Sequence, residues 1–204
     1  MTINGRIVLV TGAAKRLGRA IVLALARRHA RVVISYRSSS RDALATVREL
    51  ERCGAQALAV RANLSKPADV KRLMARIRQR FGRLDILINS AANFGRSPFE
   101  TLTERDWDLA LDTNLKGPFL CALYGSRLMG KGGKIINLAD WSGVRPYRDY
   151  LPYCVSKAGV IGLTKALAKE LAPSIQVNAI APGPILPPAG MSTRERARII
   201  QRVP

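Results

Sequence analysis

Three side chains in the second half of the sequence have the types and spacing of an acid–base site. Tyr153 and Lys157 lie four positions apart in a stretch of helical character, and Asp140 precedes Tyr153 by thirteen residues. Because an α-helix repeats every 3.6 residues, positions four apart share a face, so the phenol and the ammonium are expected side by side. A nearby cation favours the phenolate, so we expect Lys157 to lower the pKa of Tyr153 from its ordinary value of about 10. The trio predicts a general acid, Tyr153, with Asp140 placed to orient or reprotonate it.

A glycine-containing turn near the N-terminus predicts a place for phosphate groups. Residues 11–18 read Thr-Gly-Ala-Ala-Lys-Arg-Leu-Gly and stand between an apolar run and a helical stretch. Glycine lets the backbone turn tightly and approach a pyrophosphate, while the first helical turn presents free N–H groups and the positive end of its dipole. We therefore predict that a dinucleotide's phosphates contact five residues of this turn: Gly12, Lys15, Arg16, Leu17 and Gly18.

The residues after the second apolar run favour NADP over NAD. An NAD site places an acid at this point to bind the ribose hydroxyl, whereas the 2′-phosphate of NADP needs cations. The sequence reads Tyr-Arg-Ser-Ser over 36–39, with no acid, and Lys15 supplies a second cation. We predict NADP as the cofactor, with Arg37 and Ser38 at its phosphate; the alternative is that Arg37 is only a solvated loop residue.

Apolar runs alternate along the chain with amphipathic stretches of helical length, which is the pattern of βαβ units wound into a parallel sheet. Short runs rich in Val and Ile predict six strands, at 6–10, 31–36, 55–61, 84–89, 134–138 and 175–179. Helices are predicted at 17–29, 41–53, 67–81, 103 to about 129 with a bend near Gly117-Pro118, and 151–172. Right-handed crossovers then favour an α/β, doubly wound, Rossmann-type sheet whose ligand crevice lies beyond the carboxyl ends of the strands.

Length and composition exclude several classes of protein. The 204 residues, 48% of them hydrophobic, are too few for two ordinary domains, so we expect a single dinucleotide-binding catalytic domain over residues 1–204. No apolar run approaches the roughly 20 residues of a membrane span and no signal peptide precedes the first strand, so we expect no membrane partner and a cytoplasmic location. Three cysteines without paired spacing and a single histidine argue against a disulfide, a metal site and a histidine-based triad. The net charge is +20, but the basic residues are spread along the chain without interleaved aromatic residues for base stacking. We therefore expect a small-molecule substrate and no nucleic acid.

Five separated motifs resemble those of the short-chain dehydrogenase/reductase family. They are the Thr-Gly turn, Asn-Ser-Ala-Ala at 89–92, Asn114, Tyr-Cys-Val-Ser-Lys at 153–157, and Pro-Gly at 182–183. The resemblance implies that Tyr153 is the general acid, that Lys157 contacts the nicotinamide ribose and lowers the pKa of Tyr153, and that Asn114 holds a water linked to Lys157. It also implies a homo-oligomer, commonly a tetramer, and cofactor contacts from six further positions: Asn63, Leu64, Asn89, Ala91, Pro182 and Gly183.

Two departures from the common family pattern bear on the substrate. Arg16 stands where most members carry a glycine, and Asp140 where most carry a serine. Both changes occur together in pteridine reductases, which also have an aromatic residue at the position of Phe94. We expect a flat pterin to lie between Phe94 and the nicotinamide, with Arg16 at its polar edge or at the cofactor phosphates. Asp140 would relay a proton through Tyr153.

A third departure keeps other functions open, because Ser90 and Ala92 replace an amide and a hydroxyl of the pteridine-reductase pattern. The predicted function is NADPH-dependent hydride transfer to a C=O or C=N carbon, with a pteridine as the favoured substrate. One alternative is reduction of a 3-oxoacyl thioester on a carrier protein, which the basic surface suits and Asp140 disfavours. The other is a cofactor-binding or scaffolding protein without turnover, since the family normally continues past Pro204 into a helix and a seventh strand. We expect the sequence to be incomplete at its C-terminus, or else the natural chain to be shortened.

Overall fold

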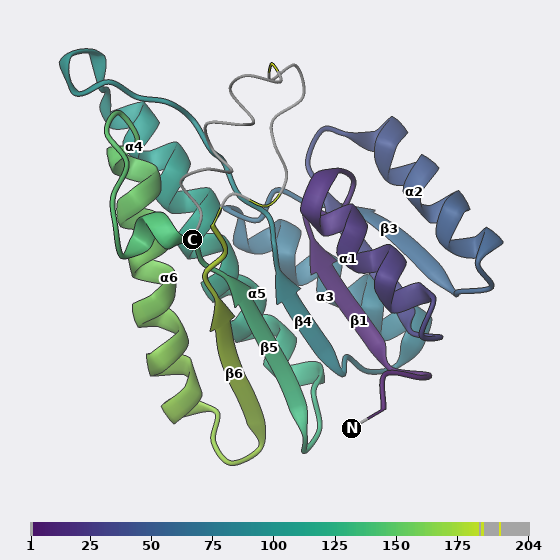
Figure 1. Ribbon diagram of the computed structural model, residues 1–204. Helices are drawn as coiled ribbons and strands as arrows, with labels where there is room; N and C mark the ends of the chain where they lie inside the picture. The colour runs from purple at the N-terminus through teal and green to yellow at the C-terminus, as the bar shows by residue number, and fades with distance from the viewer. Residues whose placement is uncertain (1, 184, 186–191, 193–204) are drawn as a thin grey trace.

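Six short strands form one parallel sheet, in the order β3-β2-β1-β4-β5-β6 (Figure 1). The computed structural model describes residues 2–183, 185 and 192. The strands are β1 (Ile7–Thr11), β2 (Arg31–Tyr36), β3 (Ala57–Arg61), β4 (Ile86–Asn89), β5 (Gly133–Leu138) and β6 (Ile175–Ile180). The strand order reverses between β1 and β4, which is the switch point where doubly wound sheets bind ligands. The α/β, doubly wound fold predicted from the alternation of apolar and amphipathic stretches is confirmed.

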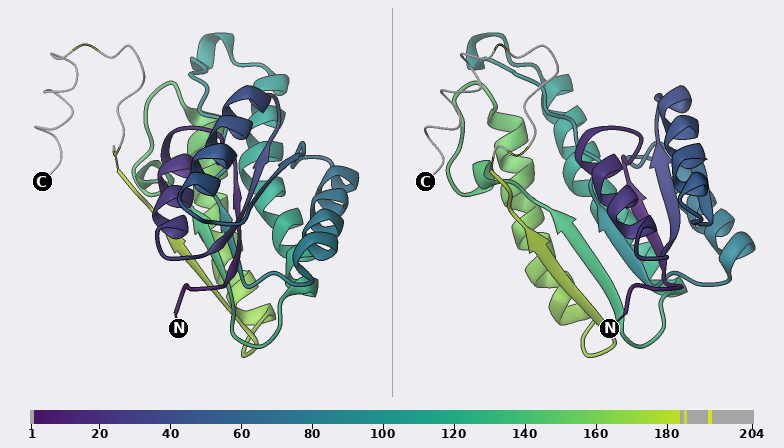
Figure 2. Two further views of the ribbon diagram at one scale, coloured as in Figure 1. Left: turned by 90° about the vertical axis from the view of Figure 1, so that its right-hand side faces the viewer. Right: turned by 45° about the vertical axis from the view of Figure 1, so that its right-hand side comes forward.

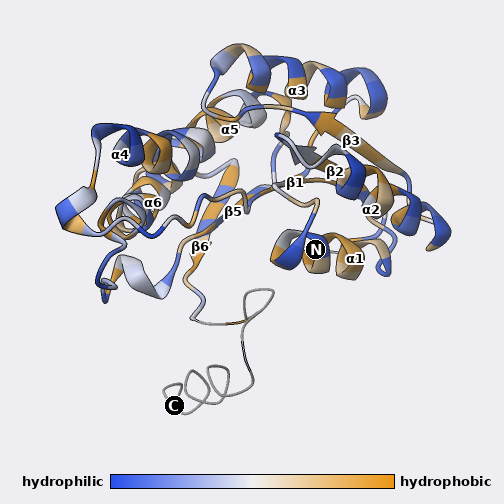
Figure 3. Cartoon of the chain, turned by 90° about the horizontal axis from the view of Figure 1, so that it is seen from above, coloured by the Kyte–Doolittle hydropathy of each residue, from blue (hydrophilic) through white to orange (hydrophobic). Residues whose placement is uncertain are grey.

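Helices cover both faces of the sheet, as the view from above shows (Figure 3). The α-helices are α1 (Arg16–Ala26), α2 (Ser40–Arg52), α3 (Pro67–Phe81), α4 (Glu104–Leu111), α5 (Gly117–Gly125) and α6 (Leu151–Glu170). Helices α1 and α2 lie on one face, and α3, α4, α5 and α6 lie on the other (Figures 2 and 3). Among the described residues, no helix is long and apolar enough to cross a membrane.

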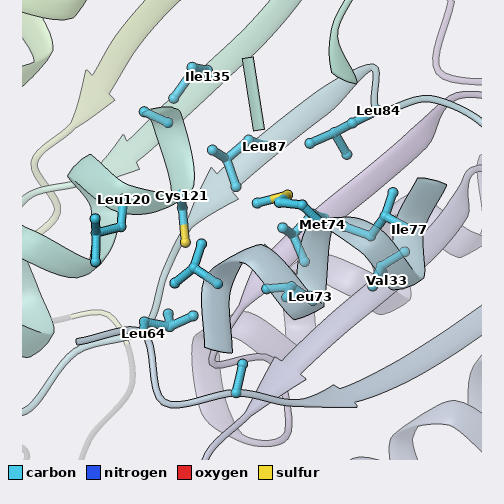
Figure 4. Close-up of a cluster of buried hydrophobic side chains, with 14 of the residues drawn as sticks. Val33, Leu64, Leu73, Met74, Ile77, Leu84, Leu87, Leu120, Cys121 and Ile135 are labelled. Carbon is cyan, nitrogen blue, oxygen red and sulfur yellow. The ribbon is translucent and has the colours of Figure 1, made fainter. Parts of the chain in front are cut away.

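Strand β1 shows why its first four residues are all apolar. Ile7 and Leu9 belong to the buried cluster under α3 and α5, whereas Val8 and Val10 belong to the cluster under α1 and α2. Successive side chains of a strand point to opposite faces, so a strand covered on both faces buries apolar side chains at successive positions. Figure 4 shows the first cluster, in which Leu73, Met74 and Ile77 of α3 pack against Leu87 of β4.

The long helix predicted over 103 to about 129 is interrupted just before the expected bend. Helix α4 passes into a π-helical segment, η2 (Asp112–Lys116), which continues into α5 and the 3-10 turn η3 (Ser126–Leu128). Pro118 has no N–H to donate to the carbonyl of residue 114, so the regular hydrogen-bond ladder cannot continue through this point. The π segment contains Asn114, so the irregular backbone falls at a predicted site residue.

Strand β6 forms one end of the sheet among the described residues. Its alternation fits cover on one face only, because Ile175 and Val177 are buried while Gln176 and Asn178 are exposed. The buried pair packs in the cluster beneath α6.

Gly12 provides a test of how the end of β1 holds the neighbouring strand. Its φ is +67°, and a Cβ at this position would lie 2.7 Å from Cα of Ala91. We expect Gly12→Ala to lower the free energy of unfolding by about 3 kcal/mol, because a left-handed backbone costs about 1–2 kcal/mol and overpacking adds to it.

The matched control is Gly54→Ala, since Gly54 has φ +77° and nothing within 4 Å of an added Cβ. This variant should carry only the conformational cost, about 1 kcal/mol. Urea denaturation of both proteins measures the difference, and equal losses would show that the contact with Ala91 does not constrain the turn.

Candidate functional site

The predicted acid–base trio comes together at the carboxyl end of β5. Asp140 begins the 3-10 turn η4 (Trp141–Gly143), and Tyr153 lies in the first turn of α6. The hydroxyl of Tyr153 donates a hydrogen bond of 2.9 Å to Oδ2 of Asp140. The other carboxylate oxygen, Oδ1, accepts from the backbone N–H of Ser142 at 2.8 Å. Asp140 is therefore held in place by the chain and is positioned to orient the phenol.

The ammonium of Lys157 lies near the ring of Tyr153 but hydrogen-bonds to a backbone carbonyl. Its side chain is buried, and Nζ donates to the carbonyl oxygen of Leu138 at 2.6 Å. Nζ is 5.6 Å from the centroid of the Tyr153 ring. The shared helix face predicted from the four-residue spacing is thus present, but the ammonium bonds to the last residue of β5.

The expectation that Lys157 lowers the pKa of Tyr153 is wrong for these residues as they are arranged. Burial raises the pKa of the Tyr153 phenol, and the negative charge and hydrogen bond of Asp140 raise it further. The pKa of Lys157 is lowered to about 8, because desolvation disfavours the ammonium and the charge of Asp140 offsets only part of that effect. Sequence spacing identified the cation but could not show that the carboxylate lies closer to the phenol.

Asn114 connects the site to the loop after β4. Its Oδ1 accepts from the backbone N–H of Asn93 at 2.6 Å, and its Nδ2 donates to the carbonyl of Asn93 at 2.9 Å and to Oγ of Ser156 at 3.0 Å. Ser156 in turn donates to the carbonyl of Tyr153 at 2.6 Å. Asn114 therefore fastens the loop that leads to Phe94 against the helix that carries Tyr153. Its predicted role of holding a water remains a prediction.

Phe94 lies beside the phenol, where the sequence placed it. Its ring stacks on Tyr150 with centroids 4.6 Å apart and meets the ring of Tyr153 edge to face at 4.7 Å. The loop around it is tied down, because the backbone N–H of Ser97 donates to the carbonyl of Asp149 at 2.7 Å. The exposed part of the Phe94 ring faces the solvent side of the site, and one ring face is covered by Tyr150.

The backbone of the turn after β1 is closely packed at both of its glycines. Gly12 approaches Ala91 too closely for any side chain, and a Cβ on Gly18 would lie 2.8 Å from Cα of Ala13. Helix α1 has no side-chain cap at Lys15, and the positive end of a helix dipole favours an anion at this position. These observations fit the dinucleotide phosphates predicted for Gly12, Lys15, Arg16, Leu17 and Gly18.

Arg16 explains one departure from the family pattern. Its φ is +51°, in the left-handed region that glycine adopts freely and other residues adopt at a cost of about 1–2 kcal/mol. A glycine at this position would adopt the same backbone conformation without strain. In this chain Arg16 adopts it at a cost, and its guanidinium is thereby present at the turn.

The cations predicted for the 2′-phosphate lie after the carboxyl end of β2 and in the turn between β1 and α1. Arg37 and Ser38 are exposed after β2. Lys15 forms an exposed ion pair of 3.0 Å with Asp42 in the first turn of α2. Exposed pairs of this kind are worth about 0–1 kcal/mol, so the ammonium can exchange Asp42 for a phosphate.

Two predicted cofactor contacts, Asn63 and Leu64, also have structural roles. Oδ1 of Asn63 accepts from the hydroxyl of Ser65 at 2.9 Å, ordering the turn before α3. The side chain of Leu64 is buried in the core and packs toward Gly117, so only its backbone can face a cofactor. A side-chain role for Leu64 is therefore excluded by its burial.

The remaining predicted residues lie at the ends of β4 and β6. Asn89 donates from Nδ2 to Oδ1 of Asn137 at 2.8 Å, and its own buried Oδ1 has no hydrogen-bond partner among the described residues. Ala91 closes on Gly12, as described above. The carbonyl of Pro182 accepts from the N–H of Trp141 at 3.0 Å, which places the segment with Gly183 beside η4.

Two residues that support the site were missing from the predicted set. Oγ1 of Thr11 accepts from the N–H groups of Ser90 and Ala91, at 2.9 and 3.1 Å, and so joins the end of β1 to the loop after β4. Ser156 links Asn114 to the helix of Tyr153. Thr11 precedes Gly12 and Ser156 precedes Lys157 in the sequence. Adjacency to a predicted site residue was the sequence signal that could have identified them.

Comparison with known proteins gives concordant matches. A sequence model of short chain dehydrogenases matches residues 6–198. The 3-oxoacyl-[acyl-carrier-protein] reductase of Synechocystis sp. is 39% identical over 184 residues, which cover 89% of this chain and 74% of that protein. The (2S)-[(R)-hydroxy(phenyl)methyl]succinyl-CoA dehydrogenase subunit BbsD of Thauera aromatica is 38% identical over 193 residues, covering 92% and 76%. A short chain dehydrogenase from Burkholderia cenocepacia, solved in complex with NADP, superposes with a TM-score of 0.90 at 33% identity, covering 97% and 82%.

The depressed pKa of Lys157 predicts how stability depends on pH. The pKa is about 8 in the folded chain against an ordinary value of 10.5, so between these values the unfolded chain holds a proton that the folded chain has released. The free energy of unfolding therefore rises with pH in this window. We expect wild type to gain about 2 kcal/mol between about pH 8 and about pH 10 relative to Lys157→Met.

Urea denaturation across this range provides the measurement. The window stops at about pH 10 because the raised pKa of Tyr153 has the opposite effect above the ordinary pKa of tyrosine. Parallel curves for the two proteins would show that the ammonium of Lys157 is not desolvated.

Proposed function

Because this chain belongs to the short-chain dehydrogenase/reductase family, we propose that it reduces the 3-oxo group of an acyl thioester, with Tyr153 as the proton donor. The chain is an NADP-dependent oxidoreductase. The observation that carries the proposed chemistry is the hydrogen bond of 2.9 Å between Tyr153 and Asp140 at the end of β5.

The acyl thioester is supported by the relatives. Both curated relatives described above are named for acyl groups attached to a carrier, an acyl-carrier protein in one case and CoA in the other. They favour the thioester alternative over the pteridine suggested by Arg16, Asp140 and Phe94. The basic composition of the chain is also compatible with an anionic carrier.

The residues of the phosphate turn would hold NADP through the backbone around Gly12 and Gly18, with Lys15 and Arg37 as cations for its 2′-phosphate. Gly12 packs against the backbone of Ala91 with no room for a side chain, which holds the phosphate turn against the loop after β4. When bound, NADPH supplies the hydride for the carbonyl carbon.

Tyr153 supplies the proton to the carbonyl oxygen. Its raised pKa keeps the phenol protonated at neutral pH. An alkoxide is a strong base, of about the strength of hydroxide, so the oxygen of the reduced carbonyl can still take the proton from the phenol. Asp140 fixes the direction of the hydroxyl, and the ammonium of Lys157 offsets the second negative charge that appears when Tyr153 becomes phenolate.

A pteridine is the second candidate, and two observations favour it. Asp140 bonds directly to the phenol, so a carboxylate is available to relay a proton to a nitrogen heterocycle. Phe94 is 54% exposed and lies beside Tyr153. A pterin stacked on the covered face of Phe94 would have to displace the ring of Tyr150, which counts against this substrate.

Turnover assays with Tyr153→Phe and Asp140→Ser separate the candidates. NADPH oxidation would be followed with an acetoacetyl thioester and with dihydrobiopterin, for the wild type and both variants. We expect turnover of the thioester, a loss of about 10²–10⁴-fold in Tyr153→Phe, and unchanged NADPH binding in that variant. Asp140→Ser should keep thioester activity, since a hydroxyl can still orient the phenol.

Other outcomes would decide against the thioester. Reduction of dihydrobiopterin alone, abolished in Asp140→Ser, would establish the pteridine reaction. NADPH binding without turnover of either substrate would favour a cofactor-binding scaffold.

The positive charges of Arg37 and Lys15 predict that the chain binds NADPH more tightly than NADH. Replacing both by Ala removes two cations from the 2′-phosphate, so we expect the Kd for NADPH to rise about 10- to 100-fold, with little change for NADH. Arg48→Ala, an exposed position farther along α2, is the control for the loss of surface charge. Equal weakening of both cofactors would contradict the charge argument.

A further inference from the structure

A second surface with its own chemistry lies between α3 and α5, away from the catalytic crevice. It is a groove of about 420 Å³. Its lining residues come from both helices and from η3: Lys71, Met74, Ala75, Arg78, Gln79, Tyr124, Arg127 and Leu128. The N–H of Leu84 donates to the carbonyl of Leu128 at 3.0 Å, so the groove borders the amino end of β4. The site of Tyr153 lies in the first turn of α6. This turn is at the other end of the strands, beyond their carboxyl ends (Figure 1).

The rim of the groove carries only positive charge. Lys71, Arg78 and Arg127 are exposed, and no carboxylate is among the lining residues. Among the described residues none of these three cations forms an ion pair, whereas their neighbour Arg72 pairs with Asp69 at 3.0 Å. The charge of the rim is therefore not neutralised by the chain itself, and an anionic partner would be attracted to it.

The floor of the groove is apolar. Met74, Ala75 and Leu128 form it together with the ring of Tyr124. An isolated phosphate or sulfate would leave this floor uncovered. A ligand that uses both floor and rim needs an apolar side and an acidic side, which is the property of an amphipathic acidic helix.

Tyr124 argues against a nucleic acid as the occupant. The ammonium of Lys71 and the guanidinium of Arg127 each lie 5.4 Å from the centroid of its ring. Base stacking requires an open aromatic face, and these two cations already occupy the ring. Both cations also stand at the edges of the apolar floor, where carboxylates flanking an apolar stripe would meet them.

We propose that the groove between α3 and α5 binds an acidic amphipathic helix of a partner protein. Apolar side chains of that helix lie on Met74, Ala75 and Leu128, and its carboxylates pair with Lys71, Arg78 and Arg127. Because the groove lies near the amino ends of the strands and Tyr153 lies beyond their carboxyl ends, the docked partner leaves the catalytic crevice open. The interaction is independent of which substrate the enzyme reduces.

Fluorescence anisotropy with a designed peptide tests this docking. The probe is a labelled peptide of about 18 residues, long enough for a helix, with Leu at three- and four-residue spacing and Glu on the remaining face. We expect saturable binding to the full chain, weakened by raising NaCl from about 0.05 M to about 0.5 M as exposed charges become screened. A peptide of the same composition in scrambled order, without an apolar stripe, should bind at least about tenfold more weakly.

Variants of the rim and floor locate the binding. The double variant Arg78→Glu/Arg127→Glu should weaken peptide binding about tenfold or more. Arg48→Glu/Arg52→Glu on α2 makes the same change in net charge at exposed positions away from the groove and should leave binding unchanged. Ala75→Glu, an exposed floor position, places a carboxylate beneath the apolar stripe and should also abolish binding. Unchanged NADPH binding shows that each variant is folded.

Three results would overturn the proposal. Equal loss in the rim pair and in the α2 pair would mean that only overall charge matters. Equal binding of the ordered and scrambled peptides would mean that the apolar floor plays no part. Groove-dependent binding of single-stranded oligonucleotide or of anionic vesicles, without groove-dependent peptide binding, would assign the surface to another class of partner.

Discussion

The burial of a phenol and an ammonium beside a carboxylate at the end of one strand is the constraint on which this site depends. Tyr153 gives its hydrogen bond to Asp140, and Lys157 is buried against the carbonyl of Leu138. Burial raises the pKa of the phenol and lowers the pKa of the amine, so the two groups move apart in proton affinity and the phenol stays protonated at neutral pH. A proton donor with a nearby counter-charge results from this arrangement, and the same burial makes the stability of the fold depend on the charge of Lys157.

The framework around the trio is built from short side chains that hydrogen-bond to backbone groups and to one another. Asn114, in the π-helical turn before Pro118, binds both backbone groups of Asn93 and the hydroxyl of Ser156. Thr11 joins the end of β1 to the loop after β4 through two N–H groups. Parts of the chain that are far apart in sequence thus share a few buried donors and acceptors, and a shift in one of them moves the phenol, the phosphate turn and the loop of Phe94 together.

Much of the fold and part of the site could be predicted from the sequence. The alternation of apolar runs with amphipathic stretches predicted the parallel, doubly wound sheet, and the four-residue spacing correctly put Tyr153 and Lys157 on one helix face. The break in the long helix was expected at Gly117-Pro118 because a proline N–H is missing, although the π-helical turn lies just before it. These features could be predicted because they depend on local periodicity and on covalent chemistry, which any short window of sequence carries.

Residue types and their order along the chain thus determined the parallel sheet, the turn after β1 and the identity of the acid–base trio. Only the tertiary structure decided which member of the trio lies nearest to the phenol, and so whether its pKa rises or falls. Tertiary packing likewise turned the side chain of Leu64 into the core and covered one face of Phe94 with Tyr150. The physical reason is that pKa values and ring contacts depend on distances of a few ångströms between groups many residues apart, and spacing along a chain does not fix those distances.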